Sequence, residues 1–286
     1  MAEPLDRLPA DPRTAAVLGL GLMGGSLARD LAARGVRVLG YDHDEAHLRA
    51  ALDEGVVHTG LGPALAGLAA ADLVALAVPV GAVPALLAAA APQLARARLV
   101  LDLGSVQGGG VAAARALGLA ERFVGAHPLV GDHRSGWAAS RTGLFHQARV
   151  LLCPAADTAT ALELAEAFWA ALGARTERLG AQEHDRQMAW VSHLPQAAST
   201  ALANALAATG LRPDDAGPGG RAMLRLAASS PALWTAIALQ NAQPLRPALA
   251  ALEAELAQLR RALTAGDEEA VFRFFAAARQ WAERSR

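Results

Sequence analysis

Two patterns of apolar residues divide the chain near residue 178. In the first part, short apolar runs alternate with alanine-rich stretches of helical length, which is typical of βαβ units around a parallel sheet covered on both faces. The runs that predict strands are 15–20, 36–41, 73–78, 99–102, 123–126 and 149–153. In the second part, apolar positions recur with helical spacing and predict no further strand. The helices are expected near 181–209, 219–228, 231–264 and 267–284.

This pattern predicts an α/β fold in which a parallel-sheet domain, residues 1–178, precedes an all-helical domain, residues 179–286. The length of 286 residues agrees with two domains, because a single core seldom grows past about 250–300 residues. An apolar share of 53% is enough to bury such cores. The second set of helices reads as too apolar to be covered by one sheet domain, so we expect a homodimer through residues from about 180 onward.

Charge and composition exclude several classes of partner. The net charge of -1 leaves no basic surplus for a nucleic acid or an anionic membrane. No apolar run reaches the roughly 18–20 residues of a membrane span, and the acidic, proline-containing residues 1–13 do not form a signal peptide. We therefore expect a cytoplasmic protein that acts on a small molecule.

Three residue types narrow the chemistry further. Cys153 is the single cysteine, so an internal disulfide is excluded, and its apolar neighbours predict a buried, inert thiol. All 26 basic residues are arginines, which excludes every scheme that needs a catalytic or phosphate-binding lysine. No metal site is expected, because ligand spacing is absent around the remaining histidines, namely His43, His47, His58, His133 and His146.

A glycine-rich motif follows the first predicted strand and opens a helix. In a G-x-G-x-x-G turn, glycines permit a tight bend and close approach of a pyrophosphate, which then lies on the free N–H groups of the helix. Pro79 follows the run at 73–78, at the edge of the sheet where ligands bind. A Rossmann-type nucleotide site is therefore predicted, and its expected cofactor-binding residues are Gly19, Gly21, Leu22, Met23, Gly24, Asp42 and Pro79.

Asp42 ends the second predicted strand about 20 residues after the motif, where a carboxylate can accept both ribose hydroxyls of a dinucleotide. The same carboxylate would repel the 2′-phosphate of NADP, so NAD is the expected cofactor. A cationic His43 could partly offset that repulsion. The alternative is a plain glycine turn with Asp42 as a helix cap.

Four further segments carry a resemblance to a known family. They are 102–106 (DLGSV), 125–131 with 135–137 (GAHPLVG and SGW), 183–195 (from EHD to SHLP), and 219–234, which contains GGR, Arg225 and Trp234. Together with the glycine motif, in order and at similar spacing, they resemble the prephenate/arogenate dehydrogenase family of tyrosine biosynthesis, part of aromatic amino acid biosynthesis. The resemblance covers nearly the whole chain and implies a helical dimerisation domain.

The resemblance implies an NAD-dependent oxidative decarboxylation of prephenate to 4-hydroxyphenylpyruvate. Hydride leaves ring C4, the C1 carboxylate leaves as carbon dioxide, and the ring becomes aromatic. The catalytic residues implied are His127, a base expected just after a strand, and Ser105, which would orient the histidine and the hydroxyl. An imidazole with an ordinary pKa of about 6.5 suits that role. The structural alternatives are a non-catalytic histidine and a helix cap at Ser105 for a helix starting near Gly108.

The resemblance also implies substrate-binding residues, and these are Arg225, Ser192, Gln196 and Trp234. Arg225 would clamp a carboxylate with its planar guanidinium, although a solvated arginine is the plain alternative. Trp234 would lie near the substrate, or else pack in a core or interface. Ser192 and Gln196 are four residues apart on one helical face, which Pro195 is expected to kink. His184 and Asp185 could form a polar pair that ties this helix to the first domain.

At two positions this chain departs from the family pattern, and both changes lower the number of cationic side chains expected at the site. Gln107 and Gln196 stand where many members have lysine and histidine. Since Ser192 and Gln196 are neutral and no acidic residue shares their face within one turn, a keto group is favoured over an ammonium, and prephenate over arogenate. Arogenate or dual-specificity (cyclohexadienyl) dehydrogenase activity remains the alternative.

Two other functions are weighed against this one. β-Hydroxyacid dehydrogenases share the two-domain plan but use a catalytic lysine, which this chain lacks. A non-catalytic redox sensor that binds a dinucleotide would not need Ser105, His127 and Arg225 together.

Overall fold

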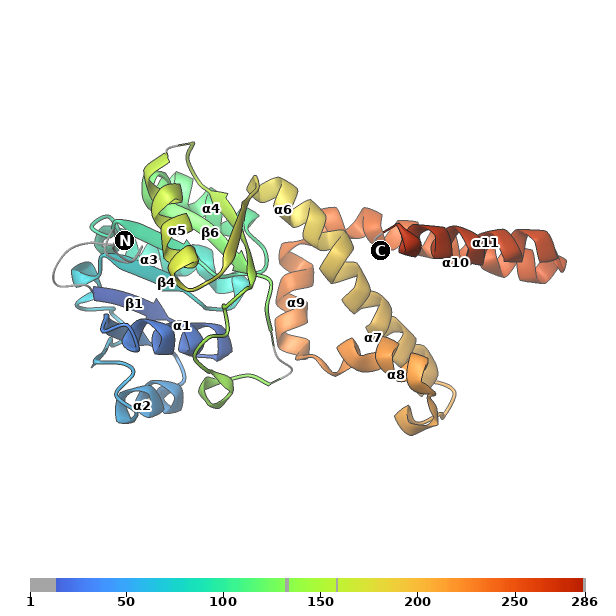
Figure 1. Cartoon of the computed structure of the whole chain (residues 1–286), viewed down its shortest axis with the longest axis horizontal. Coiled ribbons are helices and arrows are strands. Elements are labelled where there is room, and N and C mark those ends of the chain that lie inside the picture. The colour runs from blue at the N-terminus through green and yellow to red at the C-terminus, as the bar shows by residue number, and fades with distance from the viewer. Residues whose placement is uncertain (1–13, 132–133, 158, 285–286) are drawn as a thin grey trace.

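The computed structural model describes residues 14–131, 134–157 and 159–284. An eight-stranded sheet in the order β3-β2-β1-β4-β5-β6-β7-β8 forms the first domain (Figure 1). All neighbours pair in parallel except β6 and β7, which are antiparallel. The strands are β1 (Thr14–Leu18), β2 (Arg37–Tyr41), β3 (Thr59–Gly60), β4 (Leu73–Leu76), β5 (Leu99–Asp102), β6 (Phe123–Pro128), β7 (Arg149–Pro154) and β8 (Arg175–Arg178).

The predicted α/β fold is confirmed, and the structure corrects three details of its sheet. β3 and β8 were not predicted, because β3 has two residues and β8 is the largely exposed edge sequence RTER, which offers no apolar run. The predicted parallel sheet contains one antiparallel pair, β6 with β7. The strand predicted at 123–126 extends through Pro128, so His127 lies within β6 rather than after it.

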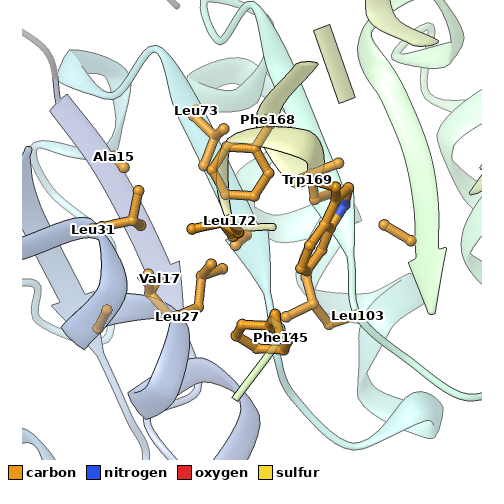
Figure 2. Close-up of a cluster of buried hydrophobic side chains, with 14 of the residues drawn as sticks. Ala15, Val17, Leu27, Leu31, Leu73, Leu103, Phe145, Phe168, Trp169 and Leu172 are labelled. Carbon is orange, nitrogen blue, oxygen red and sulfur yellow. The ribbon is translucent and has the colours of Figure 1, made fainter. Parts of the chain in front are cut away.

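Helices cover both faces of the sheet with two separate apolar clusters. On one face, α1 (Leu22–Ala32) lies on β1 and β2 and α5 (Ala159–Ala171) on β5 to β8, and side chains such as Leu27, Phe168 and Trp169 join one apolar cluster there (Figure 2). On the other face, α3 (Val83–Leu94) and α4 (Gly108–Ala116) contribute Leu87 and other apolar side chains. A further α-helix, α2 (Glu45–Asp53), follows β2, and the described part of this domain also has short 3-10 helices at Leu68–Ala70, Val80–Ala82, Ala120–Arg122 and Trp137–Ala139.

Cys153 lies in β7 and is fully buried in the second of these clusters. Burial raises the pKa of its thiol to about 12, so the group stays protonated at neutral pH. The predicted buried thiol is confirmed.

Helices alone form the second domain within residues 181–284. They are α6 (Ala181–Met188), a π-helical turn (Ala189–His193), α7 (Leu194–Ala207), η7 (Pro213–Asp215), α8 (Pro218–Leu224), η8 (Arg225–Ala228), α9 (Pro231–Gln240), α10 (Ala242–Ala265) and α11 (Glu268–Glu283). The single helix predicted over 231–264 was wrong, because the chain leaves helical geometry at Asn241 (φ -108°, ψ 23°). Pro244, within the first turn of α10, has no N–H to continue the ladder of the preceding helix.

The irregularity expected at Pro195 lies one turn earlier. Pro195 occupies the first turn of α7, where a proline is well tolerated, and the π-helical turn directly precedes that helix. Pro195 has no N–H to donate to the carbonyl of Val191, so the hydrogen-bond ladder is free to widen over 189–193. Ser192 consequently lies in the widened turn, and Gln196 lies in the regular helix that follows.

The two domains meet at the carboxyl edge of the sheet. Val80 and Val106, which follow β4 and β5, pack against Ile237 and Trp234 of α9. The α10–α11 hairpin extends away from the sheet domain (Figure 1). It carries large exposed apolar side chains, namely Leu256, Leu263, Phe272, Phe275 and Trp281.

Among the described residues, no single helix combines the length and apolarity needed to cross a membrane. One bent pair, Pro218–Ala228 with Pro231–Gln240, passes the same length and composition test only when its two parts are taken together. Residues 1–13, expected not to be a signal peptide, lie outside the described part of the chain.

Candidate active site

The glycine motif forms a tight turn between β1 and α1. Gly19 has φ +96°, and a side chain there would collide with the carbonyl oxygen of Ala77. A side chain at Gly24 would collide with the carbonyl of Gly19, whereas one at Gly21 would meet nothing within 4 Å. Gly19 and Gly24 are therefore required by the fold itself. The space beside Gly21 is unfilled, so the backbone of the turn has an open face there that a ligand can approach.

The N-terminus of α1 directly follows this open face. Its N-cap is Gly21, no side chain caps it, and no acidic residue lies in its first turn. Leu22 and Met23 occupy that turn, so their backbone N–H groups are available to an anion at the positive end of the helix dipole. This is the setting that a pyrophosphate requires.

Asp42 follows β2 and is 8% exposed. One of its oxygens accepts from the N–H of Leu20 at 2.6 Å, and the other accepts from the N–H of Asp44 at 2.9 Å. The ring of His43 lies 3.1 Å from the same carboxylate. Asp42 thus braces the glycine turn from the adjacent strand, in the place where a ribose-binding carboxylate is expected. Helix α2 is capped by Asp44, so Asp42 is not its cap.

His127, on β6, stands at the same edge of the sheet and contacts the second domain. Its Nδ1 lies 2.9 Å from Nε2 of His184, whose Nδ1 lies 2.8 Å from Oδ1 of Asp185. Burial, together with His184 and His193 nearby, lowers the pKa of His127 to about 3. The imidazole is consequently neutral at physiological pH.

Asp185 joins α6 to the start of α4. Its two oxygens accept from the backbone N–H groups of Gln107 and Gly108, each at 2.8 Å. The predicted polar pair that ties this helix to the first domain is confirmed. The contact of His184 with His127 was not predicted, because no spacing rule relates positions 57 residues apart.

Asn241 is a further residue that the sequence did not single out. Its Nδ2 donates to the backbone carbonyl of Asp185 at 2.8 Å and lies 2.9 Å from Nδ1 of His193. Both histidine and asparagine are buried. The only signal in the sequence was Asn241 itself, a polar residue inside a stretch predicted to be one continuous helix.

Ser105 lies between two buried polar groups on the loop after β5. Asp102 is 1% exposed, and burial, with a smaller contribution from Asp185, raises the pKa of its carboxyl to about 7. Gln107 donates through Nε2 to the carbonyl of Gly104 at 2.5 Å. The N-cap of α4 is Gln107, so the alternative that Ser105 caps this helix was wrong. Ser105 is half-buried beside Asp102, Gly104 and Gln107.

The proposed substrate residues lie in the second domain with different environments. Gln196 is 5% exposed, and its Nε2 donates to the carbonyl of Leu226 at 2.8 Å and to Oγ1 of Thr200 at 3.3 Å. Its amide donors are thus occupied, and it anchors η8, the turn that begins with Arg225. Arg225 is exposed and, within the described part of the chain, has no hydrogen-bond or ion-pair partner.

Trp234 and Ser192 flank the buried His193. Trp234 is half-buried, packs on the contact between the domains, and lies edge-on to the ring of His193 with 5.9 Å between centroids. Ser192 is half-buried in the π-helical turn. In the described ranges, no group of three or more His, Cys, Asp or Glu side chains is arranged to hold a metal ion. His133 lies outside those ranges.

Comparison with known proteins identifies the family. Residues 27–178 match the model of the prephenate dehydrogenase nucleotide-binding domain, and residues 180–277 match that of the prephenate dehydrogenase dimerization domain. A cyclohexadienyl dehydrogenase of Zymomonas mobilis is 32% identical over 91% of this chain and 92% of its own length. A prephenate dehydrogenase of Bacillus subtilis is 30% identical over 94% and 75%.

Solved structures agree with this result. A prephenate dehydrogenase of A. aeolicus, in complex with hydroxyphenyl propionate and NAD+, has a TM-score of 0.87 at 28% identity, covering 97% of this chain and 99% of its own. An arogenate dehydrogenase of Synechocystis has a TM-score of 0.77 at 26% identity, with coverages of 96% and 100%. The chain therefore belongs to the prephenate dehydrogenase family of oxidoreductases.

Proposed function

We propose that the protein catalyses the NAD-dependent oxidative decarboxylation of prephenate to 4-hydroxyphenylpyruvate. The observation that carries this proposal is the neutral His127, held at the carboxyl edge of the sheet and linked to a buried carboxylate through His184. The edge is the one at which the glycine turn and the N-terminus of α1 lie. A base beside a dinucleotide site is what the oxidation of a hydroxyl requires.

NAD fits the first domain. The open face at Gly21 and the uncapped first turn of α1 suit its pyrophosphate, and Asp42 suits its adenosine ribose while disfavouring a 2′-phosphate. NAD, when bound, supplies the acceptor for the hydride that leaves the substrate. The relative from A. aeolicus was solved with NAD+, which supports this assignment.

His127 is the proposed catalytic base. Its neutral ring accepts the proton of the 4-hydroxyl as hydride leaves C4, and it returns that proton to the oxygen when the C1 carboxylate leaves as carbon dioxide and its electron pair makes the ring aromatic. Ser105, on the loop after β5, is proposed to orient the hydroxyl and the histidine. The apolar contact of Val80 and Val106 with α9 closes one side of this region against water.

Arg225 is the proposed carboxylate clamp. It has no partner among the described residues, so its guanidinium is free to bind a carboxylate through two parallel hydrogen bonds. Gln196 holds the carbonyl of Leu226 next to it and therefore supports the clamp rather than offering a free donor. Ser192 and Trp234 remain the proposed contacts for the substrate side chain.

Prephenate is preferred over arogenate in this proposal because Ser192 and Gln196 carry no charge to pair with an ammonium. The expected preference for prephenate over arogenate is smaller than the sequence indicated, because the amide N–H groups of Gln196 already donate to other residues of the chain and are not free for a keto oxygen. The relatives include enzymes named for prephenate, arogenate and cyclohexadienyl substrates. Dual specificity is therefore the second candidate function.

We further propose that the active form is a homodimer. The helical domain matches a dimerization-domain model, and its α10–α11 hairpin leaves large apolar side chains exposed in the single chain. Isologous pairing of two copies would cover them.

Steady-state kinetics with purified protein and NAD tests the substrate assignment. Formation of reduced nicotinamide is followed with prephenate and with arogenate. We expect kcat/KM to be higher for prephenate. A value for arogenate tenfold above that for prephenate would contradict the substrate assignment, and the absence of turnover with both would favour a redox sensor.

A further inference from the structure

A chain of hydrogen bonds leads from the backbone of the first domain to the candidate base. Asp185 receives the N–H groups of Gln107 and Gly108 and contacts Nδ1 of His184. Nε2 of His184 contacts Nδ1 of His127. Each of these four contacts measures 2.8 or 2.9 Å, so every link is a direct hydrogen bond, and His184 is fully buried.

The direction of each bond follows from its neighbour. Two backbone donors at the start of α4, where the helix dipole is positive, stabilise Asp185 as a carboxylate, which can only accept. Nδ1 of His184 must therefore carry a hydrogen. A neutral His184 then has an unprotonated Nε2, which can only accept from His127. The hydrogen of His127 is thus on Nδ1, and the lone pair of its Nε2 is free.

The position of Asp185 is fixed from its other side as well. Asn241 donates to the backbone carbonyl of Asp185 and contacts His193, so α6 is held where α10 begins. Aspartate, asparagine and both of their histidine neighbours are buried. The carboxylate is consequently anchored by the first domain through its side chain and by the second domain through its backbone.

We propose that Asp185 is a positioning residue for catalysis: acting through His184, it selects the His127 tautomer whose Nε2 lone pair receives the proton of the substrate. The proposal rests on the function assigned above to His127. It extends that function to two residues of the second domain, so the base is complete only when the two domains are docked.

Replacement of Asp185 by asparagine tests the proposal while keeping the shape of the side chain. In the asparagine side chain one of the two carboxylate oxygens is replaced by an NH₂ group, which donates. The side chain therefore cannot accept from Gln107, Gly108 and His184 together. An amide nitrogen facing Nδ1 of His184 would reverse both histidines and place the hydrogen of His127 on Nε2. We expect kcat to fall about 10²–10⁴-fold in Asp185→Asn, with the Kd for NAD within twofold of wild type. Glu183→Gln, an exposed change on the same helix, is the control and should keep wild-type kcat.

The tautomer is measured directly by ¹⁵N-edited NMR of the histidine rings in the full-length protein at neutral pH, with the His127 signals assigned by comparison with His127→Asn. Wild type should show the hydrogen on Nδ1, and Asp185→Asn should show it on Nε2 or on both in exchange. A hydrogen on Nε2 in wild type, as a doubly protonated His184 would require, overturns the proposal. Wild-type kcat in Asp185→Asn also overturns it.

The two readouts separate this proposal from the function itself. If Asp185→Asn does not fold, the wild-type spectrum alone still decides which nitrogen carries the hydrogen. If wild type turns over neither prephenate nor arogenate, the function fails while the spectrum still reports on the tautomer.

Discussion

At the scale of single residues, the same burial acts oppositely on two groups of the site. It lowers the pKa of His127 to about 3 and raises that of Asp102 to about 7, because in each case the charged form loses its hydration. His127 is thereby kept neutral over the physiological range. Asp102 lies at the end of β5, where its Oδ1 accepts from the N–H of Gly104 and its Oδ2 has no hydrogen-bond partner among the described residues.

The raised pKa of Asp102 predicts a pH dependence of stability. Between about pH 4 and pH 7, the folded protein keeps a proton on Asp102 that the unfolded chain releases, so the contribution of Asp102 to the free energy of unfolding falls as pH rises through this window and levels off above it. The lowered pKa values of His127 and His193 contribute with the opposite sign below about pH 6.5, so the Asp102 contribution is read as the difference between wild type and a variant. A shift of about three units corresponds to a few kcal/mol at about 1.4 kcal/mol per unit. Asp102→Asn should remove this contribution, so that its stability relative to wild type rises with pH between about pH 4 and pH 7. Urea unfolding at several pH values measures it, with the exposed Asp53→Asn as a control that keeps the wild-type pH dependence.

Arg225 gives a second prediction at this scale. Arg225→Ala should raise KM for prephenate by tens-fold or more, corresponding to about 2 kcal/mol, while the Kd for NAD stays near wild type. Arg221→Ala, one helical turn earlier, removes an exposed arginine whose Nε donates to the carbonyl of Ala216, and should leave KM unchanged. Equal effects of both changes on KM would show that general positive charge, and not a clamp at Arg225, is what matters.

The sequence located the candidate residues far better than it located their contacts. His127, Ser105 and Arg225 were found through motifs, and Cys153 through its apolar neighbours. The contact of His127 with His184, and the part played by Asn241, depend on the docking of two domains, which local spacing does not encode. The lack of a partner for Arg225 among the described residues, and the hydrogen bond of the Gln196 amide to the chain itself, likewise depend on the packing of η8 against α7.

At the scale of elements, the turn between β1 and α1 contains two kinds of glycine, those that the fold requires and one that leaves room for a ligand. A side chain added at Gly19 or Gly24 would meet the protein's own backbone, and one added at Gly21 would not.

Strands and helices with strong periodicity were predicted correctly. The edge strand β8 and the break at Asn241 were missed, because RTER lacks the apolar pattern of a buried strand and the break interrupts an apolar pattern that runs on without change.

The glycine turn can be tested by a matched pair of substitutions. Gly19→Ala should destabilise the protein by about 1–3 kcal/mol or more, since alanine is strained at φ +96° and its methyl meets the carbonyl of Ala77. Gly21→Ala should keep wild-type stability but weaken NAD binding, because its methyl would occupy the pyrophosphate's approach. Thermal unfolding and calorimetric titration with NAD measure the two effects. Unchanged NAD affinity in Gly21→Ala would contradict the placement of the cofactor.

At the scale of the whole molecule, the proposed function depends on how the helical domain is held against the sheet. The contacts at Asp185 and Trp234 join the domains near the site, while the α10–α11 hairpin points away from it (Figure 1). Phe272 and Phe275 on that hairpin are 71% and 60% exposed in the single chain. Such a surface is well suited to a second copy of the chain.

Dimerisation through this hairpin predicts a change in mass on substitution. Light scattering at micromolar concentration should give twice 29.4 kDa for wild type and a lower mass for the double variant Phe272→Glu, Phe275→Glu. Glu283→Gln, on the same helix, is the control and should leave the mass unchanged. A wild-type mass of a single chain would contradict the homodimer.

The proposed role of His127 as the base of an NAD-dependent prephenate dehydrogenase is tested by comparing wild type with His127→Asn. The measurement is the rate of reduced nicotinamide formation from prephenate and NAD at saturation, together with the Kd for NAD. We predict rapid turnover in wild type and a loss of about 10²–10⁴-fold in the variant, with NAD affinity unchanged. Full turnover in His127→Asn would contradict the account.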